Sequence, residues 1–217
     1  MTPDETILND RLERGLAELG LEVADRRRGQ LLALVGLLHK WNRAYNLTAV
    51  RDPEEMVARH VLDSAAVLPF VKGPSLLDVG AGPGLPGLVL AILAPELEVT
   101  LLDSNGKKVR FQRQAVMELG LERVSPVQAR VEAFEAPPGG FDQVISRAFA
   151  SLEDFIALSR ELPGEGGQWL AMKGPAVEDE LAGLPEGIAA VGRHTLRVPF
   201  SDGDRRLVIL ERTPGDR

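Results

Sequence analysis

An acidic residue followed by a run of glycines carries the clearest chemistry in the sequence. The stretch 78–87 (DVGAGPGLPG) follows an apolar pair at 76–77 and precedes an apolar run over 88–93. This order predicts a strand, a glycine turn and a helix. Glycines permit positive φ in the turn, and they let a ligand approach the backbone where a Cβ would block it. Such a turn is typical of a site for a nucleotide-like cofactor.

The glycine spacing from Gly82 to Gly87 also matches the G-x-G-x-x-G pattern of dinucleotide sites. A pyrophosphate in such a site is held by backbone N–H groups, and Pro83 and Pro86 each lack one. S-adenosylmethionine has no phosphate, and its ammonium group favours a nearby acid such as Asp78. We therefore expect S-adenosylmethionine as the cofactor, with an NAD(P)-dependent oxidoreductase as an alternative.

A second acid, Asp103, closes the strand-like segment 97–102. It lies where a carboxylate accepts hydrogen bonds from a ribose diol in nucleotide-binding folds of this kind. The alternative for both Asp78 and Asp103 is that they cap the helices that follow them.

Composition narrows the classes of function. The chain has 217 residues, no cysteine and three histidines, so thiolate metal sites are excluded and no metal site is expected. An enzyme that methylates C5 of a pyrimidine through a thiolate adduct is excluded for the same reason. The start of the chain lacks a secretory pattern, and no apolar run approaches the roughly 20 residues of a membrane span. We expect a cytoplasmic protein without a membrane segment.

The formal net charge of −7 argues against a protein that coats nucleic acid indiscriminately. Local basic faces remain, and each has the alternative of being a solvated helix face. The densest basic clusters are Arg26–Arg28, Lys107 and Lys108 with Arg110 and Arg113, and Arg205–Arg206, with a looser set of Arg43, Arg51, Arg59 and His60.

The elements that position these residues fall into two parts. Residues 1–72 read as a helical extension, with a helix start at Thr2-Pro3, a stop at Gly20 and a helix over 25–45. Apolar residues repeat along that helix at three- and four-residue spacing, so Trp41 and Tyr45 are expected in the core. A helix from an N-cap at Asp52 to about residue 67 carries His60 and Asp63.

Residues 73–212 alternate between strands and helices, which predicts a mostly parallel sheet covered on both faces. Strands are expected at 75–79, 97–102, 123–128, 141–146 and 167–172, and helices at 85–94, 106–119 and 151–161. Segments 196–200 and 207–210 flank a turn at 201–204 and predict a C-terminal antiparallel hairpin. This pattern suits a Rossmann-like α/β fold, which we expect to be that of a class I S-adenosylmethionine-dependent methyltransferase, with residues 213–217 as a frayed tail.

An ordered set of motifs closely resembles the RsmG (GidB) family. They are His39-Lys-Trp-Asn42, Tyr45-Asn-Leu-Thr48, Arg51-Asp-Pro53, Arg59-His60 with Asp63-Ser64, the glycine turn, Leu102-Asp-Ser-Asn-Gly-Lys107 and Ser146-Arg-Ala-Phe149. The resemblance is dense from Leu38 to Lys173. It implies a bacterial enzyme that transfers a methyl group from S-adenosylmethionine to N7 of a single guanine in the 530 loop of 16S ribosomal RNA.

The resemblance also implies residue roles. It places Gly80 and Leu85 at the methionine and sulfonium part of the cofactor, and Val131 and Glu132 beside the adenine. Gly82 is a further expected cofactor-binding residue. Arg147 would hold the cofactor or the RNA, with a surface ion pair as the alternative. Together with Asp78 and Asp103, these are the expected cofactor-binding residues.

The segment after the fourth strand narrows the choice of the atom that accepts the methyl group. Amino-methylating enzymes resemble one another in an Asn/Asp-Pro-Pro-aromatic motif there, and this chain has Ser146-Arg-Ala-Phe149 instead. Guanine N7 carries no proton, so its methylation needs no general base, and no catalytic acid or base is assigned. Candidates for substrate positioning are Asn46, His60, Asp63, Arg147 and Lys173; for His60 and Asp63 an intrahelical hydrogen bond is the alternative.

The expected partner is 16S ribosomal RNA or the small ribosomal subunit, and Lys107, Lys108 and Arg110 are candidates for RNA binding. A monomer is favoured. Two further alternatives are a methyltransferase for a small molecule, in which the N-terminal helices form a lid, and a non-catalytic RNA-binding protein that retains the fold.

Overall fold

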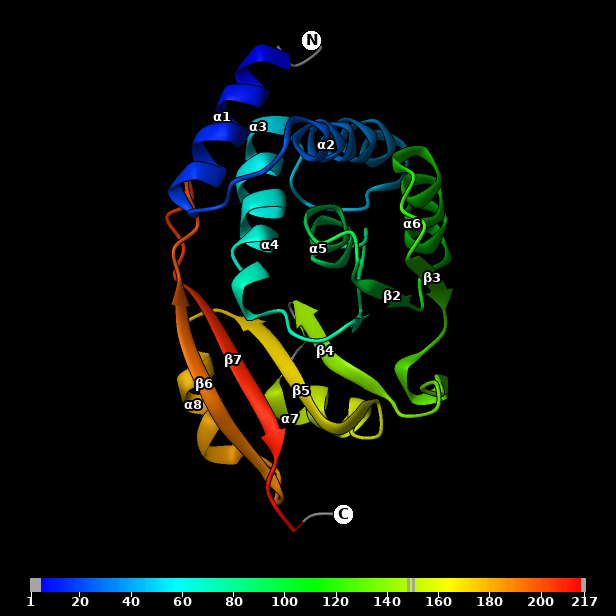
Figure 1. The fold of residues 1–217 in the computed structure, drawn as a ribbon, viewed down its shortest axis with the longest axis vertical. Helices are drawn as coiled ribbons and strands as arrows, with labels where there is room; N and C mark the ends of the chain where they lie inside the picture. Colours follow the sequence, from blue (N-terminus) through cyan, green and yellow to red (C-terminus); the bar gives the residue numbers. More distant parts are fainter. Residues whose placement is uncertain (1–4, 148, 150, 216–217) are drawn as a thin grey trace.

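The computed structural model describes residues 5–147, 149 and 151–215. Within them the strands form one seven-stranded sheet in the order β3-β2-β1-β4-β5-β7-β6 (Figure 1). Strands β1 to β5 are parallel, and β7 is antiparallel to both β5 and β6, as expected. The strands are β1 (Ser75–Val79), β2 (Glu98–Asp103), β3 (Val124–Gln128), β4 (Phe141–Arg147), β5 (Pro163–Lys173), β6 (Ile188–Leu196) and β7 (Arg205–Arg212).

Helices cover both faces of the sheet, which explains why its central strands are apolar on both sides. On one face lie α5 (Gly87–Leu93) and α6 (Gly106–Leu119), and the N-terminal helices α1 (Glu5–Glu18) and α2 (Asp25–Tyr45) complete that layer. On the other face, α7 (Leu152–Ser159) and α8 (Val177–Glu180) pack together (Figure 1).

The expected helix after Asp52 is one continuous rod made of three segments. These are α3 (Pro53–Met56), the π-helical η1 (Val57–Leu62) and α4 (Asp63–Ala65). The Asp52 carboxylate accepts the Glu55 N–H at 3.0 Å, which confirms the N-cap. A π turn inside an α-helix is rare and often marks a functional position, and here it carries His60.

Helix ends follow the local chemistry of the sequence. The Asn105 side chain accepts the N–H groups of Lys107 and Lys108 at the start of α6, and Gly120 ends that helix in the left-handed conformation. Gly20 has the same conformation after α1, which confirms the expected stop. The short 3₁₀ segments are η2 (Leu68–Phe70), η3 (Val131–Ala133) and η4 (Leu181–Gly183).

The first strand of the C-terminal hairpin differs from the expectation. The pattern at 196–200 predicts a strand, whereas β6 runs from Ile188 to Leu196 and pairs with β7 up to Leu196–Arg205. Pro199 has no N–H to donate to a ladder. Residues 188–195 have little apolar alternation of their own, so it is pairing with β7 that makes them a strand.

Three smaller expectations are also corrected or lie outside the described residues. Tyr45 is 38% exposed instead of buried, because it stands at the end of α2, while the partly buried Trp41 packs on the core. Helix α8 had no expected counterpart. The helix start at Thr2-Pro3 lies outside the described residues, as do residues 216–217 of the expected tail.

Candidate functional site

The glycine turn and three polar residues converge at one edge of the sheet. The glycine turn follows β1, Asp103 ends β2, Arg147 ends β4 and Lys173 ends β5. These strands are parallel, so their carboxyl ends lie at the same edge, where open α/β sheets bind ligands.

The glycine turn needs glycine at two positions for different reasons. Gly80 has φ 66°, and a Cβ there would project into open space, so its absence leaves the backbone accessible. Gly87 lies against the core: a Cβ there would come within 2.3 Å of Leu101 Cδ2 and 2.9 Å of Asp78 Oδ2. The turn can therefore close over Asp78 only with glycine at 87.

Asp78 is fully buried at the end of β1. Its Oδ2 accepts the Gly87 N–H at 2.8 Å, so it does hold the start of α5, as the capping alternative states. Its Oδ1 is buried without a hydrogen-bond partner. Burial is the main cause that raises the Asp78 pKa to about 7, and the Gly87 hydrogen bond opposes that shift. The free oxygen is an acceptor that a cationic ligand would complete.

Asp103 ties the turn to the second strand. Its Oδ2 accepts the Gly82 N–H and its Oδ1 accepts the Asn105 N–H, both at 2.8 Å. The cap of α6 is therefore Asn105, and the capping alternative is wrong for Asp103. A carboxylate has about four lone-pair directions, so Asp103 retains acceptor capacity for a ribose diol.

Gln112 on α6 is a buried residue that the sequence reasoning missed. Its side-chain NH₂ donates to the Gly82 carbonyl at 2.7 Å, and its Oε1 is buried without a partner. A polar residue on the inward face of an amphipathic helix was the available signal.

A cavity of about 180 Å³ opens at the glycine turn. We call it the turn cavity. Gly80 and Asp103 line it from the ends of β1 and β2, and Val131 and Glu132 line it from η3. The structure thus brings four expected cofactor-binding residues together, with Phe149 as an additional wall.

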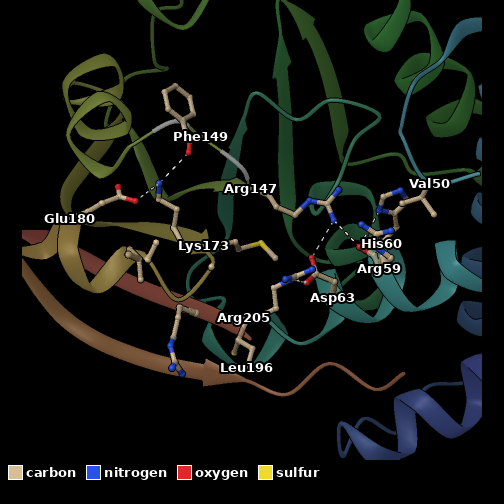
Figure 2. A pocket seen from close by; sticks show the side chains of 15 residues that line it. Val50, Arg59, His60, Asp63, Arg147, Phe149, Lys173, Glu180, Leu196 and Arg205 are labelled. Carbon is tan, nitrogen blue, oxygen red and sulfur yellow. Dashed lines mark hydrogen bonds and ion pairs between the residues drawn. The ribbon is translucent and has the colours of Figure 1, made fainter. Parts of the chain in front are cut away.

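A second cavity of about 470 Å³ lies next to it, and we call it the central cavity (Figure 2). Four of the expected positioning residues line it: His60, Asp63, Arg147 and Lys173. Phe149 lines both cavities, so they are neighbours. The volume falls in the range of small-ligand pockets, roughly 300–1,000 Å³.

Asp63 is the centre of the ionic contacts in the central cavity. Arg147 Nη1 lies 3.2 Å from its Oδ2, and Arg205 Nε lies 2.9 Å from its Oδ1 (Figure 2). Arg147 Nη1 also donates to the Arg59 carbonyl at 3.2 Å. One buried carboxylate thereby joins the helix 53–65, the end of β4 and the start of β7.

His60 is held as a neutral side chain. Its Nδ1 lies 3.1 Å from the Arg59 carbonyl, which only accepts, so Nδ1 carries the proton and Nε2 accepts from the Thr48 hydroxyl at 2.8 Å. Burial, followed by the Arg147 charge, lowers the His60 pKa to about 4. The intrahelical alternative holds for His60 only through the Arg59 carbonyl; Asp63 bonds instead to Arg147 and Arg205 outside the helix.

Lys173 completes the opposite wall of the central cavity. Its Nζ lies 3.0 Å from Glu180 Oε1 and donates to the Phe149 carbonyl at 3.2 Å (Figure 2). The charged groups of the cavity are thus largely arranged as pairs.

Other expected residues do not line these cavities. Asp78, Gly82 and Leu85 are buried beneath the turn. Asn46 caps α2 in the left-handed conformation, and its side chain accepts from Arg51. The RNA candidates Lys107, Lys108 and Arg110 stand in the first turns of α6, with Lys107 and Arg110 exposed.

Three arginines of the central cavity, Arg59, Arg205 and Arg206, belong to basic clusters that the sequence reasoning singled out without a role. The signal was present, but only the fold shows that residues 59 and 205 face one cavity. Among the described residues, no group of three or more possible ligands is arranged to hold a metal ion. None of the described helices has the length and apolar character of a membrane span.

Comparison with known proteins decides the family. The model of the GidB family, described as rRNA small subunit methyltransferase G, matches residues 27–209. The chain belongs to this family. A ribosomal RNA small subunit methyltransferase G from Chromohalobacter salexigens is 65% identical over 202 residues, covering 93% of this chain and 96% of the relative.

Solved structures confirm the fold class. A predicted O-methyltransferase from Agrobacterium tumefaciens aligns with a TM-score of 0.58 at 22% identity, covering 73% of this chain and 82% of that one. The O-methyltransferase NcsB1, solved with S-adenosylmethionine, aligns at 0.51 and 22% identity, covering 68% of this chain and 50% of that one. The chain has the class I methyltransferase fold.

The residues present fit the expected cofactor. The family is described as an rRNA methyltransferase family, and structures with the same fold are solved with S-adenosylmethionine or a related compound. Both agree with S-adenosylmethionine as the cofactor. Asp78 Oδ1 and Gln112 Oε1, both buried acceptors without donors, suit a cationic ligand at the turn. The N–H of Gly87 is already bonded to Asp78, which removes a donor that a pyrophosphate would use and argues against the NAD(P) alternative.

Proposed function

We propose that this methyltransferase transfers a methyl group from S-adenosylmethionine to N7 of a single guanine in the 530 loop of 16S ribosomal RNA. The observation that supports it is the pair of adjoining cavities, one at the glycine turn and one lined by His60, Asp63, Arg147 and Lys173. We assign the adenosyl part of the cofactor to the turn cavity and the target base to the central cavity.

The residues of the central cavity suit an acceptor that carries no proton. S-adenosylmethionine supplies an electrophilic methyl group when bound. His60 is neutral at pH 7 because its pKa is about 4, and Asp63 is occupied by two arginines. The lone pair of His60 Nε2 already accepts from the Thr48 hydroxyl, so neither His60 nor Asp63 is free to take up a proton. Guanine N7 has no proton to lose, so positioning carries the catalysis.

Acids offset part of the positive charge around the position assigned to the target base. Methylation at N7 leaves a cationic base, which an unpaired cation would oppose. Asp63 carries one negative charge against the two positive charges of Arg147 and Arg205, and Glu180 pairs with Lys173, so these acids reduce the positive charge of the lining without cancelling it. We assign to Arg147 a role at the boundary between cofactor and base. It lines the central cavity, and its positive charge opposes the rise that burial causes in the Asp78 pKa.

Labelled methyl transfer tests the proposal. The enzyme is given 30S subunits and deproteinised 16S RNA from cells lacking this activity, and the product is mapped by strand cleavage specific for 7-methylguanine. Label at one guanine of the 530 loop is the expected result. Label elsewhere, or turnover of a free nucleoside or metabolite instead of RNA, would overturn it and favour the small-molecule alternative. Cytoplasmic location, a monomeric state and the division into residues 1–72 and 73–212 stay predictions.

A further inference from the structure

A third hollow continues the path that begins at the glycine turn. It measures about 400 Å³ and lies between the middle of helix α1, the helix 53–65 and the loop from β6 to β7. We call it the outer groove. Arg59 and Arg205 line both the outer groove and the central cavity, so the three hollows adjoin one another in a row, which we call the path. In Figure 1 the β6–β7 loop reaches the lower end of α1 beside α4.

Phe200 is the unusual residue of the outer groove. It has φ 61°, a conformation that bulky residues rarely adopt, and it remains 37% exposed. Such strain is concentrated at functional positions. The Arg11 guanidinium lies 4.5 Å from the centre of its ring, and that of Arg14 lies 5.6 Å away. Stacking on a ring orients a guanidinium group while its edge keeps N–H donors for a ligand.

Donors without acceptors lie along this path. Arg11 Nε in the outer groove and Arg206 Nε in the central cavity are buried without a hydrogen-bond partner. Arg14 is exposed and forms no ion pair within the part of the chain that the structure describes. Arg59 is paired with Glu55 only loosely, at 3.6 Å between two exposed side chains. Glu55 and Asp202 are the acids that line the groove, and Glu54 beside it forms a loose ion pair with Arg11, at 3.7 Å from its Nη1.

We propose that the outer groove binds the RNA strand that flanks the target base. Arg11, Arg14 and Arg59 contact its phosphates, and Phe200 holds the first two guanidinium groups in place. Phosphate oxygens are acceptors that satisfy buried arginine donors, and bidentate contacts suit planar guanidinium groups. The assignment rests on the proposed function, because it takes the base in the central cavity as the starting point of the strand.

The test compares Arg59→Gln with a matched control, Arg123→Gln. Both side chains are about half exposed, at 53% and 55%, and each pairs with one glutamate, Glu55 or Glu98. Arg123 precedes the edge strand β3, at the opposite end of the sheet from β6. Binding of deproteinised 16S RNA is measured over a range of salt, and cofactor binding is measured by calorimetry.

We expect Arg59→Gln and Arg14→Gln each to weaken RNA binding several-fold and to reduce the salt slope by about 1, as for a lost phosphate contact. Arg123→Gln should leave both unchanged, and all three should bind the cofactor normally. Variants of 59 and 14 that behave like Arg123→Gln would overturn the proposal, as would weaker binding with no change of salt slope.

Phe200 gives a second, independent readout. Phe200→Leu keeps an apolar side chain in the same strained backbone but removes the ring, while Phe200→Tyr keeps the ring. Loss of RNA affinity in the leucine variant with retention in the tyrosine variant is expected, and equal behaviour of the two would overturn the role of the ring. RNA binding by these variants is scored apart from methyl transfer, so a missing 7-methylguanine defeats the proposed function without deciding the groove.

Discussion

The glycine turn lacks hydrogen-bond donors, whereas the arginine-lined path lacks hydrogen-bond acceptors. We give this name to the central cavity and the outer groove together, after Arg11, Arg59, Arg205 and Arg206. At the turn, Asp78 Oδ1 and Gln112 Oε1 are buried acceptors without donors; along the path, Arg11 Nε and Arg206 Nε are buried donors without acceptors. Native structures leave few such groups. A cationic cofactor completes the first pair and a polyanion completes the second, so the polarity of the site distinguishes its two ligands.

The buried titratable groups divide in the same way. Asp78 at the turn and His60 in the central cavity are both shifted toward their neutral forms by burial, with the Asp78 pKa raised to about 7 and the His60 pKa lowered to about 4. Each region holds one group that costs free energy when it is charged. Because one group is an acid and the other a base, their effects on stability have opposite pH dependence.

The largest expected effect is on the pH dependence of the free energy of unfolding, to which Asp78 and His60 contribute with opposite sign. The raised Asp78 pKa makes stability fall as pH rises from about 4 to 7, on the order of 4 kcal/mol. The lowered His60 pKa makes stability fall as pH drops from 6.5 to about 4, on the order of 3 kcal/mol. In the wild type these trends oppose each other.

Single variants therefore shift the slope of stability against pH in opposite directions from wild type. Asp78→Asn should gain more stability between pH 4.5 and 6.5 than wild type does, and His60→Gln should gain less. Urea unfolding of the three proteins at both pH values measures this difference, since all other groups are shared. Parallel pH profiles would show that the two groups are not held neutral by burial.

The second prediction concerns only the hydrogen-bond acceptor at the glycine turn, the Asp78 carboxylate. Asp78→Asn keeps the shape of the side chain but removes the carboxylate that suits a cation. We expect cofactor affinity to fall by about 10- to 100-fold, the range for a hydrogen bond to a charged group, with RNA affinity unchanged. Titration calorimetry checks this, with Asp142→Asn as the control because Asp142 bonds Ser75 at the far end of β1. A normal affinity in Asp78→Asn would contradict the polarity of the turn.

The two regions also differ in how much of them the sequence predicts. The turn is a contiguous motif: the strand, the glycines and the acid at 78 lie within a few residues, so local pattern predicts both structure and ligand. Gly80, Asp103, Val131 and Glu132 meet in the turn cavity as expected. The free oxygen of Asp78 and the part played by Gln112 required the three-dimensional structure.

The arginine-lined path is assembled from four separate segments, and periodicity says nothing about which of them meet. Arg205 follows a turn whose incoming strand was placed too late, at 196–200 instead of 188–196. Its bond to Asp63 spans 142 positions. Basic clusters are visible in the sequence, but only the structure shows that Arg59 and Arg205, from two different clusters, line the same cavity. Long-range assembly of this kind carries no local signal.

Asp63→Asn is a smaller perturbation that acts where the two regions meet. Removing the carboxylate leaves Arg147 and Arg205 without their shared partner in the central cavity, which we assign to the target base. We expect a loss of about 2 kcal/mol in the free energy of unfolding, below the value for a fully buried pair because both arginines are partly exposed. Methyl transfer should fall about 10-fold with cofactor affinity retained.

Chemical denaturation and steady-state kinetics measure the two effects of Asp63→Asn. The control is Glu98→Gln, which removes a carboxylate from an exposed ion pair with Arg123 and should change neither by more than the small amount typical of a surface pair. If Asp63→Asn has full activity, Asp63 does not position the arginines of the central cavity.

The smallest expected effect concerns the basic residues of α6. Lys107 and Lys108 stand in the first turn of that helix, where the helix dipole disfavours cations. Replacing both with glutamine should therefore raise stability by about 0.5–1 kcal/mol. If they contact phosphates, RNA affinity should fall and the salt slope should decrease by about 2, while cofactor affinity stays the same. A gain in stability without a change in salt slope would confine the RNA surface to the arginine-lined path. The two lysines would then form a solvated helix face that tolerates an unfavourable interaction with the helix dipole and does not bind RNA.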